Sequence, residues 1–156
     1  MKLVVTTTQS KSGLNTDLEE FLLETKLDFV NRTGRSIEQI QKEYEANGVI
    51  VWHKEGPILY IEGQKFYFHP SMAKNRISVY RKLGNEDPFV LACDLQNNDE
   101  VLDCTLGLGA DATVASFFCP NGRVVGLESS SPIAWVVKWG MKLYKSKINW
   151  LDEAIH

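Results

Sequence analysis

The residue types best suited to chemistry lie in one stretch, from Val101 to Ala112. A predicted strand ends at Asp103, and Gly107 and Gly109 follow it closely. Because glycine has no side chain, the backbone of such a turn can approach a ligand closely. The helix expected next offers free backbone amides at its first turn. The stretch therefore predicts a loop that holds a small ligand.

A carboxylate further along the chain gives this loop a partner. A second predicted strand ends at Glu128, about twenty residues after the last glycine, a spacing at which nucleoside-binding folds place an acid that accepts ribose hydroxyls. Two glycines alone also occur in plain tight turns. The order of strand, glycine loop, helix and acid-ended strand is the context that a nucleoside site requires. We therefore expect a nucleoside cofactor here.

The charges around the loop bear on which nucleoside cofactor fits. Ala112 occupies the third position of a G-x-G-x-x-G pattern, which the dinucleotide fingerprint permits. Asp103 and Asp111 are poorly placed for a diphosphate, because like charges repel. A cationic sulfonium cofactor with an amino-acid tail tolerates those carboxylates. Structural alternatives stay open: Asp103 satisfying loop amides, Asp111 capping the helix, and Thr105 holding the turn.

The segments before the loop predict a small module of mixed strands and helices. A β-branched run over 2–8 precedes a helix that begins near Asp17 and is capped by Thr16. A short strand over 28–30 leads to a helix that starts at Ser36 and ends at Gly48. The runs VIVWH, PILYI and KFYFH, separated by short glycine-containing turns, then predict a β-meander.

The rest of the chain predicts helices around a parallel β-α-β unit. A basic helix over 72–82 is followed by a helix that starts at Pro88, and Ser131 and Pro132 begin a strongly apolar helix over 133–144. We expect an α/β fold in three parts: a mixed α/β module over 1–71, a helical linker over 72–95, and an incomplete Rossmann-like domain over 96–156.

The loop residues also carry a family resemblance. VLDCTLGLGADA with VVGLESS resembles motifs one and two of class I S-adenosylmethionine (SAM)-dependent methyltransferases, in particular the bacterial family that contains the small-subunit rRNA guanine-N2 methyltransferase. FHPSMAKNRISVYRK and the opening VTTTQ resemble the linker and N-terminal module of relatives in that family, so the resemblance spans essentially the whole chain. It implies that the last part is the first β-α-β portion of a Rossmann-like methyltransferase domain.

What the resemblance implies about function is a SAM-dependent methyltransferase whose substrate is RNA, with guanine N2 of ribosomal RNA as the target. It implies a cofactor site with contacts from Ala110, Asp111, Glu128 and Ser129, in a pocket shaped by Asp103, Thr105, Gly107 and Gly109. The catalytic residues stay unassigned, because no Asn-Pro-Pro-Tyr or Asp-Pro-Pro-Tyr segment occurs. A non-catalytic nucleotide-binding or interaction module is the alternative.

The chain stops directly after a helix, where a class I methyltransferase sheet would continue with further strands. A two-stranded parallel sheet is not a stable domain by itself. We therefore expect a truncated methyltransferase that is inactive alone. Its open sheet edge or its apolar helix over 133–144 would favour self-association.

Composition narrows the remaining possibilities. With 44% hydrophobic and 24% charged residues the chain should fold, and its net charge of -3 argues against coating nucleic acid through bulk positive charge. The basic residues Lys74, Arg76, Arg81 and Lys82 could contact RNA phosphates or form a solvated helix face. The scattered positions of the histidines and cysteines predict that no metal site is present. The cysteines are expected to be buried free thiols. The absence of a leader or a long apolar run predicts a cytoplasmic protein.

Overall fold

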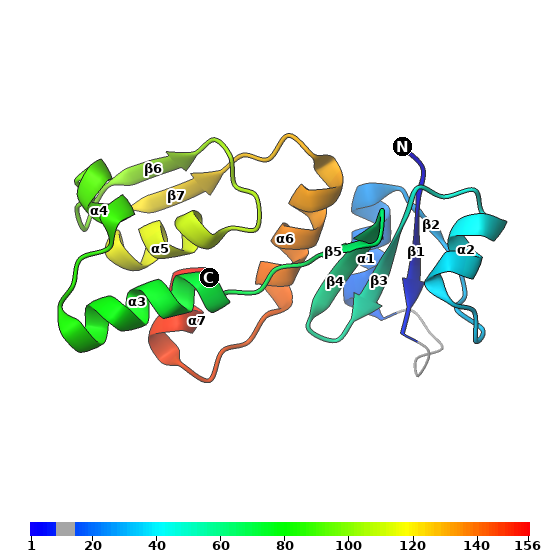
Figure 1. Ribbon diagram of the computed structural model, residues 1–156, viewed down its shortest axis with the longest axis horizontal. Helices are drawn as coiled ribbons and strands as arrows, with labels where there is room; N and C mark the ends of the chain where they lie inside the picture. Colours follow the sequence, from blue (N-terminus) through cyan, green and yellow to red (C-terminus); the bar gives the residue numbers. More distant parts are fainter. Residues whose placement is uncertain (9–14) are drawn as a thin grey trace.

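The computed structural model describes residues 1–8 and 15–156 (Figure 1), so Gln9 of the VTTTQ opening lies outside the described residues. The strands within these ranges are β1 (Leu3–Thr7), β2 (Asp28–Phe29), β3 (Gly48–His53), β4 (Gly56–Ile61), β5 (Gln64–Phe66), β6 (Glu100–Asp103) and β7 (Arg123–Gly126). The helices are α1 (Thr16–Thr25), α2 (Ile37–Glu43), α3 (Ser71–Leu83), α4 (Pro88–Cys93), α5 (Ala110–Phe118), α6 (Ser131–Leu143) and α7 (Asn149–Ile155).

The N-terminal strands form a mixed sheet in the order β2-β1-β3-β4-β5. The β1 strand runs parallel to β2 and β3, and β3, β4 and β5 form the antiparallel meander that the sequence predicts. Successive side chains of a strand point to opposite faces. On β1, Val5 accordingly packs with Phe21 of α1, while Val4 packs with Ile40 of α2. The expected α/β fold class is confirmed.

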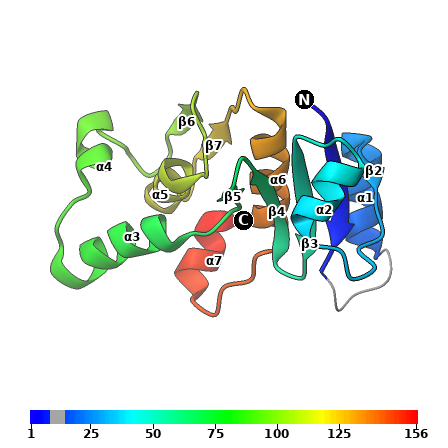
Figure 2. The same ribbon diagram turned by 45° about the vertical axis from the view of Figure 1, so that its right-hand side comes forward.

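The apolar helix α6 packs against this N-terminal sheet, which corrects the expectation that its apolar surface is open for self-association. Val136 and Trp139 of α6 are buried in one cluster with Trp52 of β3 and Phe21 of α1. The backbones come very close, because a Cβ added at Gly140 would lie 2.4 Å from the Cβ of Phe68. In Figures 1 and 2, α6 stands between the two sheets.

The second sheet is the parallel pair β6-β7, as the sequence predicts. Helix α5 connects the two strands, and α3, α4 and α7 pack beside it (Figure 2). Ala73 and Ile77 of α3 share a buried cluster with Val90 of α4 and Val114 of α5. Leu102 on β6 and Leu127 after β7 are more than half exposed, so part of this sheet is uncovered.

Several local expectations need correction. Helix α1 is capped by Asn15, whose side chain accepts the Leu18 amide at 2.9 Å, and Thr16 is its first residue. Helix α2 begins after Ser36 as expected, and Ser36 forms a capping box with Gln39, but the helix ends at Glu43 and Gly48 begins β3 instead. Helix α6 has Ser130 in the N-cap position, one residue earlier than expected.

The remaining observations concern the thiols, membrane-spanning helices and metal ligands. Of the expected buried thiols, only Cys119 is buried within the described residues, while Cys93 and Cys104 are exposed. No helix in the described ranges is long and apolar enough to cross a membrane. The same residues contain no cluster of three histidine, cysteine, aspartate or glutamate side chains that could hold a metal ion.

Candidate functional site

The carboxyl ends of β6 and β7 bring the two predicted parts of the site together. Asp103 at the end of β6 is in register with Gly126 at the end of β7. Backbone pairing continues beyond the strands, since the Leu127 amide donates to the Asp103 carbonyl at 2.7 Å and the Leu106 amide donates to the Leu127 carbonyl at 2.9 Å. The glycine loop is thereby tied to the segment that carries Glu128.

Gly107 and Gly109 both adopt a backbone conformation that favours glycine, but their surroundings differ. Both adopt left-handed backbone conformations, with φ of 51° at Gly107 and 78° at Gly109, which disfavour other residues. A Cβ at Gly109 would lie 2.6 Å from Cε of Met141 on α6, the flexible end of a side chain that can move away, so the backbone conformation is the main reason for glycine there. At Gly107 the nearest atom would be the Thr105 carbonyl at 3.7 Å. The backbone at Gly107 is therefore open to a close approach.

The Glu128 carboxylate lies directly against this open backbone. Its Oε2 accepts the Gly107 amide at 3.0 Å, and its Oε1 accepts the Ser130 amide at 2.8 Å. The Ser130 amide, with the Gly107 amide adding to it, holds the pKa of Glu128 below its ordinary value. An ionised carboxylate offers about four lone-pair positions, so acceptor capacity remains for hydroxyl groups. This observation fits the expected contact with a ribose.

The amides at the start of α5 complete the polar surroundings of the loop. The first intrahelical bond runs from the Thr113 amide to the Gly109 carbonyl at 3.1 Å. The amides of Ala110, Asp111 and Ala112 precede that bond and belong to the first turn, where helical amides lack helical acceptors. They lie immediately after the loop, so the expected first-turn donors are in place for a carboxylate or hydroxyl of a ligand.

The remaining predicted residues have mainly local partners. Asp103 accepts the Thr105 amide at 2.9 Å, which is the structural role that the sequence left open for it. Ser129 Oγ lies 3.5 Å from Glu128 Oε1, at the limit of a hydrogen bond. The structural alternative that Asp111 caps its helix is wrong, because Gly109 occupies the N-cap without a side-chain bond.

Asp111 is instead paired with Arg76, for which the sequence left an RNA contact and a solvated helix face open. Its Oδ1 lies 2.5 Å from Nη1 of Arg76 on α3. The guanidinium balances the charge of Asp111, so this carboxylate no longer argues against a diphosphate. Asp103 remains the carboxylate near the loop that disfavours one. Sequence reasoning missed Arg76 as a member of the site because thirty-five positions separate it from Asp111.

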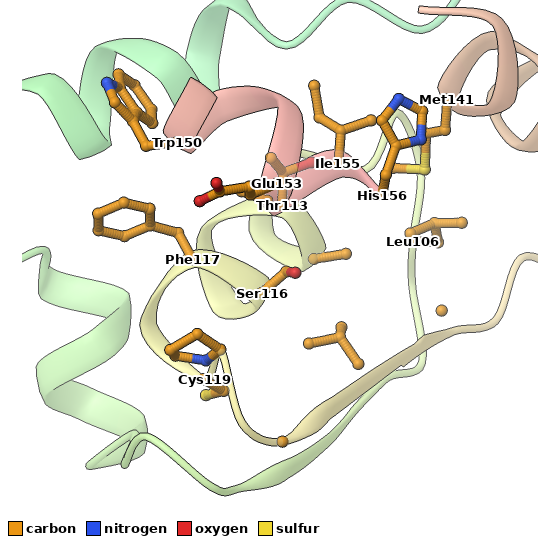
Figure 3. A pocket seen from close by; sticks show the side chains of 16 residues that line it. Leu106, Thr113, Ser116, Phe117, Cys119, Met141, Trp150, Glu153, Ile155 and His156 are labelled. Atoms are coloured by element: carbon orange, nitrogen blue, oxygen red, sulfur yellow. The ribbon is translucent and has the colours of Figure 1, made fainter. Parts of the chain in front are cut away.

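A cavity of about 800 Å³ adjoins the loop region (Figure 3). It is lined by α5, β7 and α7, with Leu106 as its contribution from the loop and with Trp150 and His156 at opposite ends. Gly107 and Glu128 do not line this cavity, whose wall is formed on their side by Leu106 and Gly126. The sequence carried no signal for the residues that α7 contributes. The predicted site thus lies at the strand ends, apart from this cavity.

Known proteins resemble this chain in sequence and in fold. No known protein-family model matches the chain. The chain is 31% identical over 133 residues to the uncharacterized protein YpiP of Bacillus subtilis, covering 85% of this chain and 51% of that protein. It superimposes with a TM-score of 0.63 and 18% identity on the crystal structure of a SAM-dependent methyltransferase from Neisseria gonorrhoeae, covering 96% of this chain and 56% of that one.

The chain thus spans about half the length of both proteins that it resembles. At 18% identity the structural likeness concerns the fold. The α/β fold of these 156 residues is therefore similar to that of part of a SAM-dependent methyltransferase.

Proposed function

We propose that this chain forms the cofactor-binding part of a SAM-dependent methyltransferase. The observation that carries the proposal is the Glu128 carboxylate, held by the Gly107 amide at the paired ends of β6 and β7. That contact places an open glycine backbone beside an ionised acceptor. The acceptor suits the ribose of a nucleoside cofactor, and the glycine backbone suits the amino-acid tail of SAM. The fold similarity to a SAM-dependent methyltransferase supports the same assignment.

The residues of the chain would bind and orient the cofactor. Glu128 would accept the ribose hydroxyls, and the Gly107 backbone would lie against the amino-acid tail. The first-turn amides of α5 would donate to the carboxylate of that tail, where the helix dipole also favours negative charge. Once bound, SAM supplies an electrophilic methyl group on its sulfonium. The role of this chain in catalysis is therefore positioning.

Calorimetric titration with SAM and, separately, with NAD tests the assignment. We expect the wild-type chain to bind SAM in preference to NAD. Glu128→Ala should weaken SAM binding by about 1.5 to 3 kcal/mol, which is the cost of losing a hydrogen bond to a charged group. Glu86→Ala, which removes an exposed carboxylate before α4, should leave the affinity unchanged and serves as the control. Equal affinity for NAD, or an unchanged Glu128→Ala variant, contradicts the proposal.

RNA, with guanine N2 of ribosomal RNA as the target, is the substrate that we propose. Of the basic residues on the linker, Arg76 is paired with Asp87 and Asp111, whereas Lys74, Arg81 and Lys82 are exposed. The guanidinium of Arg81 lies 5.1 Å from the ring centroid of Trp150. Lys74 and Lys82 are therefore the side chains on this helix best placed to reach phosphates.

Replacing Lys74 and Lys82 together by alanine should lower RNA affinity and flatten its dependence on salt, because fewer phosphates are neutralised. Fluorescence anisotropy with a ribosomal RNA fragment at several salt concentrations measures both quantities. Lys54→Ala with Lys147→Ala, two exposed lysines on other segments, is the charge-matched control. An identical salt slope in the Lys74 and Lys82 variant would leave α3 as a solvated linker. Because the chain is expected to be inactive alone, radiolabelled methyl transfer to the same RNA should give no turnover, and turnover at an ordinary enzymatic rate would contradict that expectation.

A further inference from the structure

Arg76 occupies a junction between the linker and the glycine loop. It lies on α3 and is partly buried, with its guanidinium bound to two carboxylates from different elements. Nε and Nη2 donate to the two oxygens of Asp87, each at 2.8 Å, and Nη1 donates to Asp111 at 2.5 Å. The fork of an arginine suits such bidentate pairing, and its planarity sets the direction of the remaining donor.

Asp87 anchors the guanidinium. Its side chain is only 5% exposed, and it also caps α4 by accepting the Phe89 amide at 3.0 Å. Arg76 holds the pKa of Asp87 below its ordinary value, so this buried carboxylate is ionised and requires its partner. The Arg76 guanidinium additionally lies 5.7 Å from the ring centroid of Phe89. These contacts immobilise Arg76 before any contact with Asp111 is counted.

The second partner connects this anchored group to the predicted cofactor site. Asp111 stands in the first turn of α5, two residues after Gly109. Its side chain is 57% exposed, so an ion pair with a mobile cation would contribute little to stability. Because Arg76 is already held by Asp87, the pair loses less side-chain entropy and can act on the position of the turn.

We propose that Arg76 is a positioning residue for the glycine-rich loop: it holds Asp111, and through Asp111 the first turn of α5, in the orientation that receives the cofactor. The inference rests on the proposed function, since it concerns the same site. Through Arg76 the linker helix α3 acts on the amides of Ala110 and Asp111. Arg76 thus acts on this site through Asp111, and we do not assign it to RNA binding.

Hydrogen exchange of backbone amides in the ligand-free protein tests this positioning directly. Asp111→Asn leaves the bidentate pair between Arg76 and Asp87 in place and removes the charge that Arg76 holds. We expect the hydrogen-bonded amides within 105–113 to exchange faster by on the order of fivefold in this variant, with the buried amides of β3 unchanged. Arg76→Gln should show at least this increase, with a further rise around α4 because the buried Asp87 loses its partner. Lys74→Gln, which changes an exposed cation on the same helix, should show no increase.

SAM titration of the same variants separates this inference from the proposed function. Where the wild type binds SAM, Arg76→Gln should weaken binding by about tenfold, and Arg76→Lys should restore only part of it, because lysine lacks the fork. A wild type that does not bind SAM refutes the proposed function, while the exchange data still decide the positioning role. Unchanged exchange of the hydrogen-bonded amides within 105–113 in both Asp111→Asn and Arg76→Gln, or a uniform rise across the whole protein in Asp111→Asn, overturns the inference.

Discussion

Three carboxylates near the glycine loop have different roles because their surroundings differ. Glu128 accepts two backbone amides, Asp103 accepts the Thr105 amide, and Asp111 faces a guanidinium. A carboxylate that accepts amides is kept ionised without a counter-charge, which leaves it able to accept further hydroxyls. A carboxylate in an ion pair is already neutralised. Glu128 is therefore the better candidate for a ligand contact.

A histidine away from this site lies in surroundings that should make the stability of the protein depend on pH. His53 ends β3, and its buried Nε2 has no hydrogen-bond partner among the described residues. Burial lowers the pKa of His53, with Arg32 adding to the effect, because desolvation disfavours the charged ring. The folded state thus binds fewer protons than the unfolded chain. The contribution of neutral His53 is complete above the unfolded pKa of about 6.5 and is lost as pH falls through the lower folded pKa.

We therefore expect the free energy of unfolding to fall as the pH drops from 7 toward 5. His53→Gln should show a shallower pH dependence of the free energy of unfolding over the same window, because glutamine does not titrate. Urea denaturation of both proteins at several pH values measures the difference. Parallel curves for the two proteins would mean that His53 does not contribute the slope.

The residues of the loop were predictable from sequence to different degrees. The contact between Gly107 and Glu128 follows from strand order, because parallel strands place their carboxyl ends at one edge. The pairing of Asp111 with Arg76 could not be predicted, since it depends on how α3 packs against α5. Residue type alone also could not separate Asn15 from Thr16 as the cap of α1, because both side chains suit that position.

At the scale of elements, periodicity specified a buried helix but not its partner. The apolar pattern of α6 gave its buried surface correctly, and the partner turned out to be the N-terminal sheet. Two glycines make that contact possible, since a Cβ at Gly56 would lie 3.0 Å from Cα of Gly140. Gly48 was misassigned as a helix end because a glycine also suits a crowded strand. A Cβ there would lie 2.9 Å from the Tyr60 carbonyl.

The packing of α6 predicts whether the substitution Gly140→Ala raises or lowers the free energy of unfolding. Helix propensity favours Gly140→Ala by about 1 kcal/mol. The added methyl group would instead overlap Phe68 at its Cβ, an atom that cannot swing away, and overpacking typically costs about 1 to 3 kcal/mol. We expect Gly140→Ala to lower the free energy of unfolding, as measured by urea denaturation.

Lys138→Ala on the exposed side of the same helix is the control for this substitution. It removes a pair with Glu24 at 2.7 Å, and exposed pairs contribute about 0 to 1 kcal/mol. The effect of Gly140→Ala should exceed that of Lys138→Ala. A stabilised Gly140→Ala protein would show that α6 and the segment at Phe68 adjust to the extra atom.

At the scale of the whole molecule, the two sheets differ in how completely they are covered. The N-terminal sheet has helices on both faces and residues such as Val4 and Ile50 with no exposed surface. Charged pairs, including Lys142 with Glu20 at 2.8 Å, also join α6 to α1. In the β6-β7 sheet, by contrast, Leu102 is 57% exposed and Leu127 is 51% exposed. The predicted division at 71 and 95 stays a prediction.

This uneven covering leads us to propose self-association through the β6-β7 sheet. Two-stranded sheets are marginal alone, and the outer edges of β6 and β7 have no strand partner within residues 1–8 and 15–156. Because α6 is covered by the N-terminal sheet, it is not the surface through which copies would meet. Of the two surfaces that the sequence suggested for self-association, the uncovered β6-β7 sheet with its exposed leucines therefore remains.

Sedimentation equilibrium at several protein concentrations tests this surface. We expect the average mass of the wild type to rise with concentration, because pairing would bury the Leu102 face and satisfy open strand edges. Leu102→Glu places a charge on that face and should shift the association toward the monomer. Leu23→Glu is the matched control, since Leu23 is 78% exposed on α1, which packs on the other sheet. A wild type that is monomeric at every concentration, or a Leu23→Glu variant that dissociates as readily as Leu102→Glu, would exclude the β6-β7 sheet as the contact.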